Sequence, residues 1–159
     1  MNPKFIRDRI IKPTLEYLSP EVLEIERAIP LLLGTCAQES HLGRWRMQTG
    51  GGPAMGIWQI EPATEKDVWK NYLLFHPSLA ELVNGLRSNG GDPKEMMHND
   101  FYSCAIARII YLRDMFSLPK ADDLASQAIY YKRVFNTVLG AAKPEQYVNN
   151  WFALIEGRL

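Results

Sequence analysis

The sequence has no excess of charge of either sign. Eighteen lysine and arginine residues balance eighteen aspartate and glutamate residues in a chain of 159 residues. Proteins that bind nucleic acid through its phosphates carry a basic patch, and their isoelectric point is usually high. The even balance disfavours such a surface, and we therefore expect no nucleic acid partner.

Cysteine and histidine are also scarce. Cys36 and Cys104 do not combine with His41, His76 or His98 into a spacing that is typical of a metal site. We therefore expect no metal and no other cofactor. Both cysteines fall within apolar helical patterns, which favours buried free thiols, while the sequence leaves a disulfide between them open.

The sequence lacks a long apolar run as well. No stretch approaches the ~20 apolar residues of a membrane-spanning helix, so we expect no membrane span. The first residues, Met1 to Phe5, lead into a charged amphipathic helix and not into the apolar core of a signal peptide. We expect a protein that is made in the cytoplasm without an export signal, or a mature domain without its leader.

The chain does have clear helical periodicity. Its 47% hydrophobic and 23% charged residues are typical of a globular protein, and its length predicts one domain over residues 1–159. Start signals for helices stand at Asn2-Pro3, Ser19-Pro20, Asp92-Pro93, Asp122-Asp123 and Pro144. Pro13 should bend or split the first helix, which runs to about Leu18, and Pro30 should kink or restart the second.

Three further features complete the predicted fold. Thr64 and Asp67 form a near capping box, which predicts that a helix starts at Thr64. From about Asp100 to Phe116, apolar residues cover more than one helical face, so this should be the buried central helix. Residues 44–60 are rich in glycine, and we expect a loop there with at most a small irregular hairpin.

One acidic residue lies where a helix should face the core. Glu39 follows Leu32 by seven residues, Thr35 by four and Cys36 by three, so its carboxyl projects from the apolar face. Desolvation disfavours the ionised form of a carboxyl and raises its pKa. An acid that stays protonated near neutral pH can donate a proton to an oxygen leaving group. The alternative is a glutamate at a helix end that turns to solvent.

The residues around Glu39 carry a resemblance to a known family. Ala37-Gln38-Glu39-Ser40 is followed, seventeen residues after Glu39, by Gly56-Ile57-Trp58-Gln59-Ile60 and then by Pro62-Ala63-Thr64. This order and spacing is similar to the first two motifs of the lytic transglycosylases of the lysozyme-like superfamily. There, a Glu-Ser pair on a helix is followed by Gly-Leu-Met-Gln and a Pro-Ala-Thr segment. Near the end of the chain, Glu145-Gln146-Tyr147-Val148 is similar to a Glu-x-Tyr-Val segment of that family.

The resemblance implies a fold and a reaction. The fold would be the mainly α, α+β lysozyme-like domain, with two helical lobes and the irregular region at 44–60. The partner would be the glycan strand of peptidoglycan. Glu39 would protonate the oxygen between N-acetylmuramic acid and N-acetylglucosamine, and would then accept the C6 hydroxyl proton as a 1,6-anhydro ring closes. A chain of this kind without an export signal is typical of a phage endolysin, which depends on a holin, or of a virion-associated enzyme that degrades the cell wall.

The resemblance also implies roles for several neighbours of Glu39. Ser40 would orient Glu39 or the substrate, and Gly56 would let the backbone approach closely. Gln59 would bond to the sugar, and Trp58, which replaces the family's methionine, would stack on a sugar face or else pack in the core. Tyr130 or Tyr131 would supply the hydroxyl of the family's third motif.

The pattern departs from the family in two places. Cys104 stands where the central helix of the family has an asparagine. The third motif has two candidate matches, Phe135-Asn136 with Gly140 or else Ala128-Ile129-Tyr130.

Two other functions stay open at this point. A hydrolase of the goose-type lysozyme kind would need a second carboxylate, for which Glu61, Asp67 and Asp100 are available, and a well-placed Asp67 or Asp100 would favour it. A non-enzymatic protein that binds glycan or builds a virion would fit an exposed Glu39 paired with Arg44 or Arg46.

Overall fold

The structure, a computed structural model, describes residues 1–88, 90–137 and 140–159. It is mainly helical, and none of the described residues forms an extended strand. The helical elements in chain order are α1 (Pro3–Ile6), η1 (Arg7–Ile11), α2 (Lys12–Leu18), α3 (Ile25–Ser40), α4 (Pro62–Asn71), η2 (Leu73–Phe75), α5 (Pro77–Gly85), η3 (Pro93–Met97), α6 (Asp100–Leu112), α7 (Leu124–Tyr131), η4 (Lys132–Asn136) and α8 (Pro144–Leu154).

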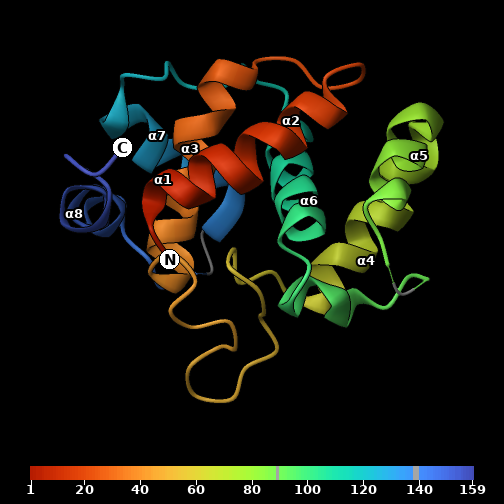
Figure 1. The fold of residues 1–159 in the computed structure, drawn as a ribbon, viewed down its shortest axis with the longest axis horizontal. Coiled ribbons are helices and arrows are strands. Elements are labelled where there is room, and N and C mark those ends of the chain that lie inside the picture. Colours follow the sequence, from red (N-terminus) through yellow and green to blue (C-terminus); the bar gives the residue numbers. More distant parts are fainter. Residues whose placement is uncertain (89, 138–139) are drawn as a thin grey trace.

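The helices are arranged around α6. In Figure 1, α4 and α5 lie on one side of α6, while α3, α7 and α8 lie on the other, and α1 and α2 cross between the two groups. One continuous hydrophobic cluster reaches from Ile6 to Ile155. The residues of α6 from Tyr102 to Ile109 are all buried, as we expected for a central helix. No helix of the described residues is both long and apolar enough to cross a membrane.

The first predicted helix forms as three consecutive segments. Asn2 caps it as predicted, because its side chain accepts a hydrogen bond from the Lys4 backbone N–H at 2.8 Å. The turn before Pro13 is a π-helix, η1, in which the N–H of Lys12 bonds to the carbonyl of Arg7. Proline has no N–H, and its ring clashes with the preceding turn of an α-helix. The wider π-helical turn before Pro13 relieves that clash.

The second predicted helix starts later than expected. Residues Ser19 to Glu21 continue the end of α2 as turns, and α3 begins at Ile25 and passes through Pro30 without interruption. A buried arginine explains part of the difference, because Arg108 of α6 donates a hydrogen bond of 3.0 Å to the Leu23 carbonyl. This long-range contact holds the segment in a non-helical conformation.

The ends of the other helices mostly follow local signals. The side chains of Asp92 and Asp123 cap η3 and α7, and Pro144 opens α8. The capping box at Thr64 was a wrong prediction, since α4 begins two residues earlier with Pro62 in its first turn. Cys36 and Cys104 are both free and fully buried, and burial raises the pKa of each thiol.

Residues 44–60 form an irregular loop that extends away from the helices (Figure 1). Its only β-type pairing is two isolated antiparallel bridges, Met47 with Met55 and Met55 with Ile60. Gly56 fixes the base of the loop, because its φ is +75° and a Cβ there would lie 2.2 Å from the Met96 carbonyl oxygen. The loop therefore packs against η3 through a position that only glycine can fill.

This packing predicts a large difference between two glycines of the loop. Gly56→Ala should destabilise the protein by about 2 to 4 kcal/mol, because it adds left-handed strain and a clash with backbone. Gly50→Ala is the matched control: its φ is +87°, but a Cβ there would meet nothing within 4 Å. It should cost only the strain, about 1 kcal/mol. Urea unfolding of both variants measures the difference, and equal losses would contradict this account of Gly56.

Candidate active site

Glu39 lies at the edge of a cleft of about 840 Å³. The walls come from the end of α3, the 44–60 loop, the start of α4, the end of α6 and η4. The lining residues are Glu39, Gln48, Thr49, Ala54, Gln59, Ile60, Glu61, Thr64, Ile110, Arg113, Asp114, Arg133, Val134, Phe135, Asn136, Thr137, Gly140 and Ala141. Cleft walls thus come from segments far apart in the sequence.

The Glu39 carboxyl is half-buried and has one hydrogen-bond partner among the described residues. The hydroxyl of Tyr131, itself fully buried in α7, donates to Glu39 Oε1 at 2.5 Å. Desolvation raises the pKa of Glu39 to about 7, although the bond from Tyr131 acts in the opposite direction. Glu39 is therefore an acid that keeps its proton to near neutral pH while it faces a cleft.

Two aromatic rings pack against the ring of Tyr131. The ring of Tyr131 lies 5.2 Å from that of Tyr147 and 6.1 Å from that of Phe135, measured between centroids. Tyr147 belongs to the predicted Glu-x-Tyr-Val segment, and its hydroxyl donates to the Leu31 carbonyl of α3 at 3.1 Å. α8 thereby contacts both α3 and Tyr131 through the one side chain of Tyr147.

The structure distinguishes between the two candidate tyrosines. Tyr131 contacts Glu39, whereas Tyr130 stacks on Tyr111 at 5.6 Å and its hydroxyl is 3.4 Å from the Phe116 carbonyl oxygen. Tyr130 does not line the cleft. Of the two candidate matches to the third motif, Phe135-Asn136 with Gly140 is the one at the site, because all three residues line the cleft.

Gln59 is the second predicted residue that faces the cleft. Its amide nitrogen donates to the carbonyls of Gly56 and Trp45, at 2.8 and 3.1 Å. Both acceptors are carbonyl oxygens, so the orientation of the amide is fixed and its own oxygen remains available as an acceptor. Gln59 can therefore bind a hydroxyl or amide donor of a ligand in the cleft.

Three other predicted residues do not face the cleft. Trp58 is fully buried and its indole N–H donates to the Leu32 carbonyl at 2.9 Å, so neither ring face can stack on a sugar. Gly56 allows a close approach to Met96 and not to a ligand. Ser40 is also fully buried. A sugar contact of Trp58 was therefore wrong and its alternative, packing in the core, is confirmed, while Ser40 and the close backbone approach of Gly56 serve to pack the loop onto the helices.

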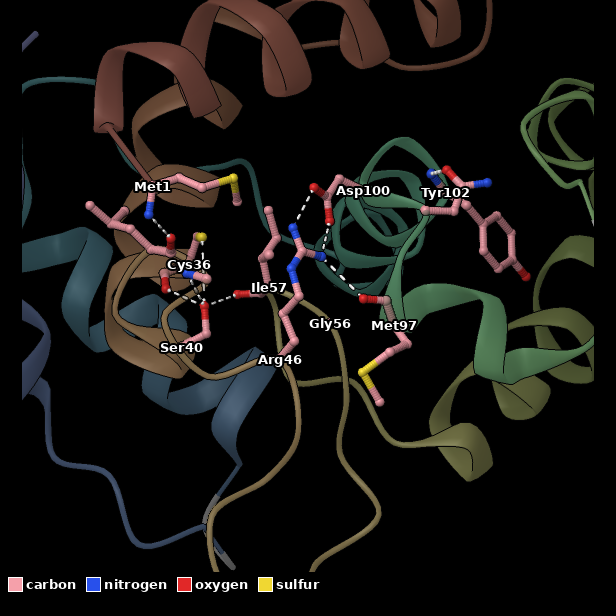
Figure 2. Close-up of polar contacts among 12 residues, drawn as sticks. Met1, Cys36, Ser40, Arg46, Gly56, Ile57, Met97, Asp100 and Tyr102 are labelled. Carbon is pink, nitrogen blue, oxygen red and sulfur yellow. Dashed lines mark hydrogen bonds and ion pairs between the residues drawn. The ribbon is translucent and has the colours of Figure 1, made fainter.

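Ser40 joins the end of α3 to the loop. Its hydroxyl donates to the Ile57 carbonyl at 2.6 Å and accepts from the N–H of Gly43 at 2.8 Å. Figure 2 shows a second attachment, in which Arg46 makes a two-pronged ion pair with Asp100 and also bonds to the Met97 carbonyl. Ser40 thus holds the loop against α3, the helix that carries Glu39, and Arg46 holds the loop against the start of α6.

Several lining residues were not anticipated from the sequence. Arg133 makes two hydrogen bonds to Asp114, at 2.8 and 3.0 Å, across the space between η4 and the end of α6. Arg113 pairs with Asp67 at 2.7 Å. These pairs join residues that are 19 and 46 positions apart, so no local spacing could have indicated them.

No group of histidine, cysteine and acidic residues suited to a metal occurs in the described part of the chain.

Comparison with protein-family models, with curated proteins and with solved structures found no match to this chain.

The raised pKa of Glu39 predicts a pH-dependent stability. Between pH 4.5, its ordinary pKa, and about 7, the folded protein holds a proton that the unfolded chain releases. The free energy of unfolding should therefore fall as pH rises through this interval, by on the order of 2 kcal/mol. Glu39→Gln should remove this contribution and be the more stable protein at pH 8.

Urea unfolding between pH 4 and pH 8 measures this effect. Glu61→Gln is the matched control, because Glu61 is an exposed carboxyl that lines the same cleft. In the control, the free energy of unfolding should change with pH as it does in the wild type. If it changes in the same way in Glu39→Gln, Glu39 is not a desolvated acid.

Proposed function

We propose that the protein is a lytic transglycosylase with a lysozyme-like fold, which cleaves the glycan strands of peptidoglycan with Glu39 as its catalytic acid. The observation that carries the proposal is the combination of cleft position and raised pKa at Glu39. A protonated carboxyl at a cleft wall is what cleavage of an acetal requires, because the departing oxygen must receive a proton.

The proposed reaction needs one carboxyl in two steps. Glu39 donates its proton to the bridging oxygen, and the bond from that oxygen to C1 of the muramic acid breaks. The resulting carboxylate then accepts the proton of the C6 hydroxyl, whose oxygen attacks C1 and closes the 1,6-anhydro ring. Glu39 ends in its original protonated state. Tyr131 can hold the carboxyl in place throughout, because its hydroxyl can donate to either form.

The other carboxyls near the site support a mechanism with one acid. Asp114 is engaged by Arg133 on the cleft wall. Asp67 and Asp100, the candidates for a hydrolytic second carboxylate, do not line the cleft and pair with Arg113 and Arg46. A hydrolase would have to use Glu61, which does line the cleft. Glu61 is thus the residue on which the hydrolytic alternative depends.

The non-enzymatic alternative has less support. It would be favoured by an exposed Glu39 in an ion pair with Arg44 or Arg46. Glu39 is instead half-buried and bonded to a neutral tyrosine, while Arg46 is engaged by Asp100. A site that only binds glycan would also have no need for a protonated carboxyl.

The first test is the substitution Glu39→Gln. It keeps the shape of the side chain and its ability to accept from Tyr131, but it removes the transferable proton. Turnover of purified peptidoglycan should fall by at least about a thousandfold, a loss at the upper part of the range for a general acid. Mass spectrometry of the products should find 1,6-anhydromuramic ends in the wild-type digest.

The same digestion separates the alternatives. Glu61→Gln should keep most of the activity and the same anhydro ends. Reducing muramic ends, together with a Glu61→Gln variant as inactive as Glu39→Gln, would make the two-carboxylate hydrolase the better account. A wild-type protein that binds peptidoglycan without releasing fragments would favour the non-enzymatic function.

The second test is the pH–rate profile. The first step needs protonated Glu39, whose pKa is raised to about 7, so the rate should fall as pH rises through about 7. At low pH the rate should fall again as the fold weakens, because the paired carboxyls of Asp67 and Asp114 have lowered pKa values and their protonation breaks ion pairs. The optimum should lie at mildly acidic pH. A rate that already falls as pH rises through about 5 would contradict a catalytic Glu39 whose pKa is raised by desolvation.

A further inference from the structure

Two glutamine amides of the 44–60 loop line the cleft in fixed and opposite orientations. The Gln59 amide nitrogen is used by two carbonyls, so its oxygen remains available as an acceptor. Gln48 has the reverse arrangement, because its Oε1 accepts from the Ala54 N–H at 3.0 Å. None of the described residues accepts from the Gln48 amide nitrogen, which carries two N–H donors. The loop thus presents one donor group and one acceptor to the same cleft.

Gly52 leaves room for the Gln48 amide. A Cβ at Gly52 would overlap the oxygen, carbon and nitrogen of that amide, so the amide lies directly against the glycine. The φ of Gly52 is not positive, and its backbone conformation therefore gives no other reason for a glycine. Closing the loop does not need the Gln48 side chain either, because the backbone N–H of Gln48 already donates to the Ala54 carbonyl at 3.1 Å. The fixed amide with its two donors therefore points to a ligand.

The loop holds the two amides at a separation that suits one small group. The Gln48 amide is bonded at Ala54 and the Gln59 amide at Gly56, and two positions along the chain span roughly 7 Å. The two bridges of Met55 hold the segments of both glutamines beside this stretch. In a trans secondary amide the N–H and the C=O point in opposite directions. A donor and an acceptor that bind both of them therefore lie about 7 Å apart, since each bond spans about 2.9 Å.

We propose that Gln48 and Gln59 together bind the acetamido group of a 2-acetamido sugar. The Gln48 amide nitrogen donates to the C=O of that group, and Gln59 Oε1 accepts from its N–H. The proposal rests on the proposed function for the kind of polymer, because N-acetylmuramic acid and N-acetylglucosamine both carry this group. It adds Gln48 as a residue that determines specificity, which no motif of the sequence indicated.

A peptide bond offers the same N–H and C=O as an acetamido group, but the apolar part of the site favours the sugar. Ala54 and Ile60, from the same loop, are both buried and line the cleft. Their side chains suit the methyl group in which an acetamido group ends. A peptide would continue past its amide on both sides and would place a further polar backbone group against this apolar surface, at a cost in desolvation.

The test measures binding in the Glu39→Gln protein, called the parent below, so that no ligand is turned over. The probes are two β-1,4-linked hexasaccharides: chitohexaose carries an acetamido group on every sugar, and cellohexaose has a hydroxyl in its place. The parent should bind chitohexaose more tightly. Gln48→Met removes the donor without adding a charge. It should lower the affinity for chitohexaose by about three- to tenfold, the effect of one hydrogen bond, and leave the affinity for cellohexaose unchanged.

Gly52→Ala tests the placement of the amide without changing a polar group. Its methyl group should displace the Gln48 amide and cause the same loss of chitohexaose affinity as Gln48→Met, and the double variant should lose no more than either. Gly50→Ala is the matched control in the same loop, because a Cβ there would meet nothing within 4 Å. It should bind both sugars like the parent. In nitrogen-15 NMR spectra of the parent, the side-chain amide signal of Gln48 should shift with chitohexaose and not with cellohexaose.

Three results would overturn the proposal. The first is a parent without a preference for chitohexaose, and the second is a Gln48→Met or Gly52→Ala variant that keeps the preference of the parent. The third is a Gln48→Met variant that binds the free stem peptide of peptidoglycan more weakly, but not chitohexaose. If the wild type does not cleave peptidoglycan and Gln48→Met still loses the preference, the proposed function fails and the acetamido site stands. If the wild type cleaves it and Gln48→Met keeps the preference, the acetamido site fails and the proposed function stands.

Discussion

The site depends on one carboxyl group that the fold keeps partly out of water at the end of a helix. The residues of α3 before Glu39 are buried from Leu31 to Ala37, so the helix cannot rotate to bring Glu39 into bulk solvent without exposing its apolar face. Exposing a leucine side chain costs about 2 kcal/mol, which is comparable to the cost of holding the carboxyl protonated near neutral pH. Core packing therefore imposes the raised pKa on Glu39. The protonation of Glu39 near neutral pH is a consequence of where α3 must lie.

The second constraint is a loop that must hold its shape without a sheet. Only isolated bridges pair its backbone, so contacts of its side chains, and not the hydrogen bonds of a sheet, hold the loop in place. Ser40 ties the loop to α3, Arg46 ties it to α6 through Asp100, and Gly56 allows it to contact η3 (Figure 2). A buried hydroxyl, a two-pronged ion pair and a glycine at positive φ each act at a single point. Together they fix Gln59 relative to Glu39 at three places around the base of the loop.

Local signals in the sequence predicted much of the fold, and long-range contacts account for the misses. The caps at Asn2, Asp92 and Asp123 were predictable because a side-chain oxygen meets an N–H two or three residues away. The start of α3 was not, since it depends on Arg108, 85 residues from Leu23. At the site, helical periodicity placed Glu39 correctly. It could not decide whether Trp58 faces a sugar or the core, nor which of Tyr130 and Tyr131 meets the acid, because adjacent side chains differ only in the direction set by tertiary packing.

The arginines of the cleft raise the question of why Glu39 is not simply an ionised partner of one of them. A free guanidinium near a carboxyl favours its charged form and lowers its pKa. Arg113 and Arg133 both line the cleft, but each already pairs with an aspartate, Asp67 and Asp114 respectively. Each pair presents little net charge to Glu39, and desolvation remains the larger influence on its pKa. Substitution of either aspartate would release a cation beside the acid, so the two pairs protect the protonated state of Glu39 as much as they join the walls of the cleft.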